Sequence, residues 1–262
     1  MAFPNTRLIG AGFAPGQAVQ QDYEYFNDFL AGGYAATTGP IFASTANVAT
    51  FLYTALTGTP TFIISDAEPG GVVALATGAA TDNHGLECQM NGEGFEVLNN
   101  RDIYFEMRWK SQNAVASFDF AFGLATTETS VLASPAADFI GFTSGVVGGA
   151  VLDGATANIL ARTLADAAGS VWTASAATQT SADTGSDLVA DTFVTTAFWL
   201  QMNGTSGRVH YYVDGNEKFV TTSTIPATAS SPMTPTICCQ NNGSVQAIME
   251  VDYVYVAQKR AS

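Results

Sequence analysis

The sequence predicts an all-β chain that folds as a two-sheet antiparallel jelly-roll sandwich. Three observations lead to this prediction: apolar residues recur at every second position in several segments, turn signals separate these segments, and almost no segment has the 3.6-residue period of a helix. The 262 residues fit a single unit, because one β-sandwich domain often contains about 200–250 residues. We expect residues 21–262 to form one domain and residues 1–20, which have no period, to form an irregular N-terminal arm.

The clearest predicted strand covers residues 103–110, in which the odd-numbered positions from Ile103 to Trp109 are all apolar. Residues 118–124 repeat the alternation, with phenylalanines on one side. A strand with this period buries its apolar side and exposes its polar side. We predict that the two segments are antiparallel neighbours, with their phenylalanines in the core.

Further strands are expected wherever a β-branched or aromatic run lies between turn signals. Residues 157–164 are expected to form a strand, and a helix over residues 157–168 is the alternative, because Ala and Leu favour helices. Residues 176–192 are predicted to form a loop, and residues 246–257, apolar at both odd and even positions, a central strand covered on both sides. The other expected strands cover residues 22–29, 61–65, 72–75, 170–175, 198–202, 209–213, 218–222 and 236–240.

Charge and composition exclude some partners. Nine Lys and Arg face 23 Asp and Glu, which gives a formal net charge of -14. Nucleic acids and anionic membranes are bound by clustered Lys and Arg, and no window of the sequence contains such a cluster. We therefore predict no nucleic-acid or membrane partner. Charged residues make up only 12%, and this low-charge surface suits either a protein covered by neighbouring subunits or a secreted carbohydrate binder.

The cysteines and the N-terminus indicate a protein that folds in a cytoplasm. Cys88, Cys238 and Cys239 are odd in number and two are adjacent, so they make a poor disulfide framework. We expect three small buried side chains in a reducing compartment. The apolar run after Arg7 is too short for a convincing signal peptide.

No known catalytic pattern is complete in the sequence. A glycoside hydrolase needs two carboxylates that flank the sugar bond. The E-x-D-x-x-E strand of family 16 glucanases is echoed only by Glu250 and Asp252. The two histidines, His84 and His210, lie in segments expected at the surface, and no G-x-S-x-G elbow occurs. We therefore predict that the chain is not an enzyme and has no cofactor.

Metal and sugar sites have weaker signals. Asp183, Asp187 and Asp191 are spaced by four, which matches no known calcium loop, and a solvated acidic loop is expected instead. Trp199 falls on the side opposite Phe198 and is therefore expected to be partly exposed. An aromatic platform for sugars competes here with ordinary core or interface packing.

Two segments near the C-terminus resemble strands of the concanavalin A-like sandwiches, which include laminin G-like modules and family 16 glucanases. Residues 249–258 (MEVDYVYVAQ) resemble the closing strand of that superfamily. Residues 209–217 (VHYYVDGNE) resemble a strand with its Y-V-D-G turn. The resemblance implies a jelly roll over about residues 22–258.

Within that superfamily the chain is most similar to structural proteins of tailed-bacteriophage virions, in which a D-Y-V-Y-V strand precedes a basic terminus such as Lys259-Arg260. The resemblance implies a virion protein made in the host cytoplasm: a capsid decoration or cement subunit, or a head fibre. Its expected partners are the major capsid protein and two further copies in a homotrimer. The alternatives are a lectin-like carbohydrate-binding module, which would show an exposed aromatic platform on the concave sheet, and a family 16 type hydrolase.

The N-terminal arm is the predicted contact to neighbouring subunits or to the capsid. Each of its large apolar residues loses about 1.5–3 kcal/mol if it stays in water instead of being buried. Burial against a neighbour would offset the entropy lost on ordering the arm. A disordered tail is the alternative. The residues are Phe3, Leu8, Ile9 and Phe13.

Overall fold

The computed structural model describes residues 22–27, 51–65, 71–78, 84–90, 94–112, 118–127, 131–132, 138–145, 158–165, 179–227, 232–241 and 245–259. Within these residues the chain forms fifteen strands and no helix, so the predicted all-β fold is confirmed. The described residues therefore contain no helix that could cross a membrane. The predicted arm, with Phe3, Leu8, Ile9 and Phe13, lies outside the described residues.

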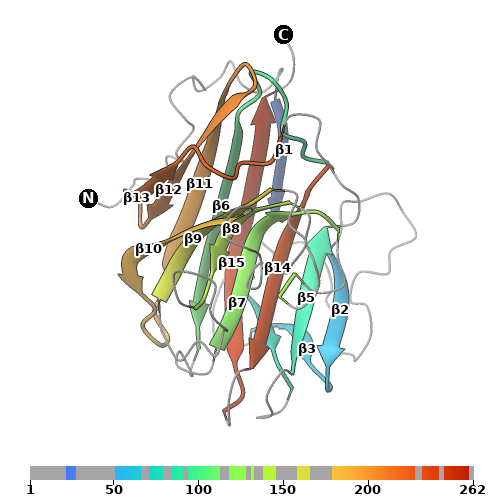
Figure 1. The fold of residues 1–262 in the computed structure, drawn as a ribbon. Helices are drawn as coiled ribbons and strands as arrows, with labels where there is room; N and C mark the ends of the chain where they lie inside the picture. The colour runs from blue at the N-terminus through green and yellow to red at the C-terminus, as the bar shows by residue number, and fades with distance from the viewer. Residues whose placement is uncertain are drawn as a thin grey trace.

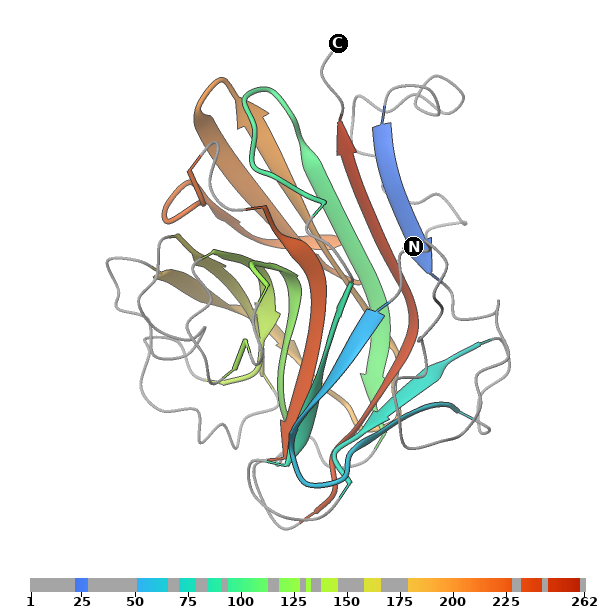
Figure 2. The ribbon, with the colours of Figure 1, turned by 90° about the vertical axis from the view of Figure 1, so that its right-hand side faces the viewer.

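Two antiparallel sheets stack face to face, as Figures 1 and 2 show. The first sheet contains β1 (Asp22–Asn27), β3 (Thr61–Ile64), β4 (Val73–Ala76), β6 (Ile103–Ser111), β11 (Val194–Asn203), β12 (Ser206–Val213), β13 (Asn216–Thr221) and β15 (Ile248–Lys259). Its order is β13-β12-β11-β6-β15-β4-β3. The first residues of β15 pair with β4 and its last residues pair with β1, so these two strands share one edge of β15.

The second sheet contains seven strands. They are β2 (Phe51–Thr57), β5 (Gly85–Met90), β7 (Phe118–Ala125), β8 (Phe139–Thr143), β9 (Asn158–Leu164), β10 (Gln179–Asp187) and β14 (Thr234–Asn241). Their order is β10-β9-β8-β7-β14-β5-β2. In Figure 2 the strands of both sheets bow in the same direction, so the outer face of the second sheet is concave and that of the first is convex.

Aromatic rings from both sheets fill the space between them. Phe105 of β6 stacks on Phe198 of β11, with ring centroids 5.2 Å apart. Across the core, Trp109 of β6 lies 4.8 Å from Phe120 of β7. The prediction that β6 and β7 are neighbours in one sheet was therefore wrong: they face each other from opposite sheets. Alternation shows which side of a strand is buried. It does not show whether two such strands pair within one sheet or face each other across the core.

A β-bulge explains why β15 is apolar at both odd and even positions. The register with β6 shifts between Val251 and Tyr253, which leaves Asp252 as the extra residue. Val251 and Val254, on either side of the bulge, both belong to the main core. The prediction of a central strand was correct. Its core-facing residues change from odd-numbered to even-numbered positions at the bulge.

The polar residues of β6 were predicted to be exposed on the outer face of the strand, but most of them are buried. Tyr104, Glu106 and Lys110 are 4%, 9% and 3% exposed, and only Arg108 is half-buried. Polar residues on this face are therefore enclosed and must be hydrogen-bonded or paired.

Residues 179–187, which were predicted to lie in a loop, form the edge strand β10. An edge strand exposes much of its surface, so its Thr, Ser and Asp residues give no apolar alternation. Residues 158–164 form strand β9 and not the alternative helix. The expected strand at 170–175 lies outside the described residues.

The dipeptide Asp214-Gly215 is a tight-turn signal between the expected strands at 209–213 and 218–222, and the structure confirms the turn. Asp214 and Gly215 connect β12 to β13 with φ angles of 47° and 72°. Two consecutive residues with positive φ define the type I′ turn that the right-handed twist of a hairpin requires.

All three cysteines are buried and have free thiols. Burial raises the pKa of Cys239 and of Cys88 well above the ordinary value of a thiol. This agrees with the expectation of small apolar side chains.

Candidate functional site

The outer face of the first sheet carries a row of side chains that crosses five strands. Pairing aligns Tyr104 with Ala257 on one side and with Trp199 on the other. Trp199 is in turn aligned with His210, and His210 with Val220 on the edge strand. We call these five residues, Ala257, Tyr104, Trp199, His210 and Val220, the cross-strand row.

Trp199 and His210 form the centre of the cross-strand row. Their rings stack with centroids 5.4 Å apart and an angle of 27° between planes. Trp199 Nε1 and His210 Nε2 are both buried, and neither has a hydrogen-bond partner among the described residues. A buried polar atom that makes no hydrogen bond costs about 1–3 kcal/mol, so this pair requires an explanation.

Glu217 fixes the orientation of His210. Its Oε2 lies 2.8 Å from His210 Nδ1 and accepts a hydrogen bond of 3.4 Å from the Tyr212 hydroxyl. An ionised carboxylate can only accept, so Nδ1 carries a hydrogen; in the tautomer whose one ring hydrogen is on Nδ1, Nε2 is an acceptor. Burial and the neighbouring Glu217 raise the pKa of Tyr212 to about 12.

A second carboxylate, Glu106, is held by two tyrosines. The Tyr104 hydroxyl donates to Oε2, and the Tyr253 hydroxyl donates to Oε1 over 2.7 Å. Burial, followed by the adjacent Glu106 charge, raises the pKa of both phenols above the ordinary value. Tyr104 also packs with Tyr255, their ring centroids 6.0 Å apart.

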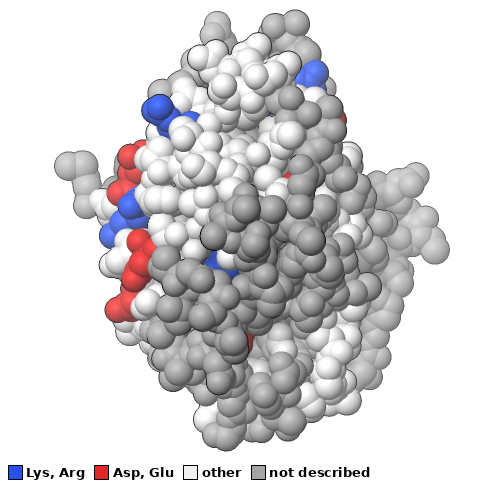
Figure 3. Space-filling model, viewed as in Figure 1, with Lys and Arg blue, Asp and Glu red and all other residues white. Residues whose placement is uncertain are grey.

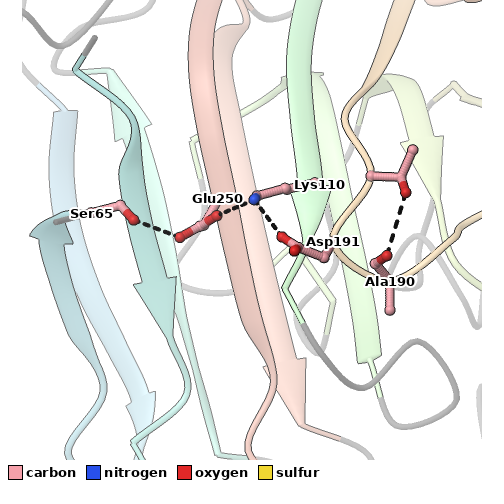
Figure 4. Close-up of polar contacts among 6 residues, drawn as sticks. Ser65, Lys110, Ala190, Asp191 and Glu250 are labelled. Atoms are coloured by element: carbon pink, nitrogen blue, oxygen red, sulfur yellow. Dashed lines mark hydrogen bonds and ion pairs between the residues drawn. The ribbon is translucent and has the colours of Figure 1, made fainter. Parts of the chain in front are cut away.

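Ion pairs continue along the same face toward the bulge. Arg108 pairs with the bulge residue Asp252. Lys110 Nζ lies 3.0 Å from Glu250 and 2.5 Å from Asp191, and Glu250 accepts a hydrogen bond of 2.6 Å from the Ser65 hydroxyl (Figure 4). Glu250 and Asp252, the echo of the hydrolase motif, are therefore both engaged in ion pairs.

The concave face of the second sheet also carries buried polar side chains. Val131 N donates to Glu87, and Gln89 donates to Thr236 over 2.9 Å. Burial lowers the pKa of Arg162, which lies on the same face, to about 10. Viewed from this side, the described Lys, Arg, Asp and Glu gather mainly at the left edge, and only a few isolated charged atoms are visible elsewhere on the described surface (Figure 3).

The other predicted candidates do not converge. Asp191 pairs with Lys110, whereas Asp183 accepts a hydrogen bond from Gly185 N. In the part of the chain that the structure describes, no three His, Cys, Asp or Glu side chains are placed to hold a metal ion. Trp109 lies in the core and donates to Thr196. The sequence also offers Asp66, Glu68, Asp82 and Asn83 as weak candidates for calcium ligands and Trp172 as a further aromatic ring, and these five residues lie outside the described residues.

Sequence reasoning identified Trp199 and His210 separately but missed Glu217. The alternation of β11 and of β12 placed each ring on the outer side. Glu217 follows a turn, where a glutamate is ordinary, and only the pairing of β12 with β13 brings it to His210. Trp199 and His210 lie on the outer face of β11 and β12, in the sheet whose outer face is convex (Figure 2), and not on the concave sheet where a sugar platform was expected.

The fold is that of the concanavalin A-like jelly-roll sandwiches. An endo-1,3-β-glucanase from Streptomyces sioyaensis matches with a TM-score of 0.60 and 12% identity over 96% of this chain and 100% of its own. An endo-β-1,4-glucuronan lyase from Trichoderma reesei matches at 0.51 and 8% over 90% and 95%. Peanut lectin matches at 0.50 and 8% over 92% and 99%. No protein-family model and no curated protein sequence matches the chain.

These similarities correct one prediction. The statement that the chain is not an enzyme was wrong, because solved structures with this fold include a glucanase and a glucuronan lyase. The missing E-x-D-x-x-E motif excludes only one arrangement of catalytic carboxylates. The glucuronan lyase has the same fold and is not a hydrolase. The virion role, the capsid partner and the homotrimer stay predictions.

The buried tyrosines predict loss of stability at high pH. Folding raises the pKa of Tyr104 and Tyr253, so their contribution is complete below about pH 10, the ordinary phenol pKa, and is lost as the pH rises above it. We expect urea midpoints to fall above that pH, and phenolate absorbance to appear together with unfolding. The double variant Tyr104→Phe/Tyr253→Phe should show a shallower decline, and an unchanged slope would contradict the assignment.

Proposed function

We propose that this protein binds carbohydrate, and that the cross-strand row is its binding surface. The observation that carries the proposal is the stacked Trp199–His210 pair, whose two ring nitrogens have no hydrogen-bond partner in the part of the chain that the structure describes. Trp199 Nε1 is a donor, and His210 Nε2 is an acceptor in the neutral tautomer with its hydrogen on Nδ1 and a donor in the protonated ring. A sugar hydroxyl is both donor and acceptor, so it satisfies both kinds of atom.

The surroundings of the pair support this function. Indole and imidazole rings offer an apolar body with a polar edge, which suits the apolar face and polar rim of a sugar ring. Gln201 and Arg208, which are exposed and paired in register, flank the rings and would have to move aside for a ligand. The fold is shared with proteins that bind or cleave polysaccharides, namely peanut lectin, an endo-1,3-β-glucanase and an endo-β-1,4-glucuronan lyase.

The test is calorimetric titration with soluble β-1,3-glucan, β-1,4-glucan and β-1,4-glucuronan. We expect at least one to bind and Trp199→Ala to lower its affinity about tenfold or more, as expected when a central aromatic anchor is lost. Trp199→Phe keeps a stacking ring but removes the N–H, so an intermediate loss is expected. The same mixtures are assayed for new chain ends, which reports cleavage.

Val245→Ala is the matched control, because Val245 is 47% exposed and lies outside the cross-strand row. Its affinity should equal that of the unmodified protein. Unchanged binding by a folded Trp199→Ala variant would contradict the site, and no binding to any of the three polysaccharides would contradict the function.

A further inference from the structure

We infer that the ligand is an uncharged, extended polysaccharide whose chain runs across the strands of the first sheet, along the cross-strand row. This inference rests on the proposed function and names the class and the orientation of its ligand. It follows from the direction of the row, the hydrogen-bonding character of its central atoms and the charges beside it.

The direction follows from strand pairing. The register aligns Trp199 with His210 and His210 with Val220, so the row is perpendicular to the strands. Neighbouring strands lie about 4.8 Å apart, a spacing similar to the length of one sugar unit in an extended glycan. Consecutive sugar units would then meet consecutive side chains of the row.

The row also reaches an accessible edge of the sheet. Val220 belongs to β13, the terminal strand of the order, and is 37% exposed. At the other end Tyr104 is 4% exposed. The accessible part of the row therefore runs from Trp199 through His210 to Val220, and a longer chain can continue past the edge.

The preference for an uncharged ligand follows from the two ring nitrogens at the centre of the cross-strand row, Trp199 Nε1 and His210 Nε2. Trp199 Nε1 can only donate, and His210 Nε2 accepts in the tautomer whose one ring hydrogen is on Nδ1 and points to Glu217. A hydroxyl can meet both requirements, whereas an ionised uronate carboxylate has no hydrogen to give to Nε2. Glu217, with 48% of its side chain exposed, lies beside His210 and repels an anionic ligand. The net charge of -14 acts in the same direction.

Arg208 is the cation that could reverse this preference. It is exposed and lies two residues before His210 on the same face of β12. An arginine binds a carboxylate through two parallel hydrogen bonds. If Arg208 governs the site, uronates bind better than neutral sugars, so the two ligand classes give opposite results.

The experiment compares neutral β-linked gluco-oligosaccharides of two to six units with glucuronan oligosaccharides of the same lengths. We expect the affinity for the neutral series to rise about tenfold between the shortest and the longest, and the glucuronan series to bind about tenfold more weakly at equal length. Val220→Ala should lower the affinity for the longest neutral oligosaccharide about threefold and leave the disaccharide unchanged, because the variant shortens one end of the row.

Val189→Ala serves as the control, since Val189 is 61% exposed and lies outside the first sheet. Equal affinity at all lengths, or tighter glucuronan binding that Arg208→Ala removes, would overturn the inference while carbohydrate binding still stands. Failure of every oligosaccharide and of the parent polysaccharides to bind would reject the proposed function and the inference with it.

Discussion

Lys110→Met should lower the free energy of unfolding by about 3–5 kcal/mol, because it leaves a buried carboxylate without its cation. The Lys110 and Glu250 side chains are 4% and 1% exposed, and Nζ lies 3.0 Å from Glu250 Oε2. After the substitution the described partner of that carboxylate is the Ser65 hydroxyl, which cannot neutralise its charge. Asp191 contributes little to this cost, because 69% of its side chain is exposed and water can solvate it.

Urea denaturation measures this effect, and the double variant Lys110→Met/Glu250→Leu tests its cause. Replacing both members of a buried ion pair with apolar residues is often neutral or stabilising, so we expect the double variant to regain most of the lost stability. Lys218→Met removes an exposed lysine of the same sheet and should change stability by less than about 0.5 kcal/mol. A loss as small as that for Lys110→Met would mean that water reaches Glu250.

Phe105→Ala should destabilise the sandwich by about 3–5 kcal/mol, because it creates a cavity that the surrounding rings cannot fill. Phe105 is fully buried, stacks on Phe198 at 5.2 Å and lies 6.5 Å from Phe122 of the opposite sheet. The ring therefore contacts both layers, and its loss weakens the packing between them.

Tyr104→Phe tests the outer side of the same strand, opposite the side of Phe105 that faces the core. This change keeps the ring and removes only the hydroxyl that donates to Glu106, so we expect a loss of about 1.5–3 kcal/mol, the value of a hydrogen bond to a charged group. Thermal or urea unfolding of both variants gives the comparison. A smaller loss for Phe105→Ala than for Tyr104→Phe would contradict the placement of the core between the sheets.

Local sequence was sufficient wherever short-range physics decides the structure. Alternation placed Phe105 and Phe198 inside and Trp199 and His210 outside, because side chains of a strand point alternately to its two faces. Asp214-Gly215 specified its turn, because few residues tolerate a positive φ. The same reasoning failed for β10, whose polar residues show no apolar period because it is an edge strand.

The candidate site was only partly predictable for the same reason. Trp199 and His210 were each placed on an outer face, but nothing in the sequence showed that they stack. Glu217 was not identified, because its contact with His210 depends on how β13 pairs with β12. The ion pair between Lys110 and Glu250 joins residues 140 positions apart, and neither residue has a local signal for the other.

By itself, the sequence determined the fold class, most strand positions, the turns and the buried side of each clear strand, because all of these depend on interactions between residues close in the chain. Only the tertiary structure decided which strands pair, that β6 and β7 face each other across the core, and that the bulge at Asp252 changes the parity of β15. These features depend on contacts between distant segments. In such contacts many registers satisfy the same alternation, and the packing of the whole core selects one of them.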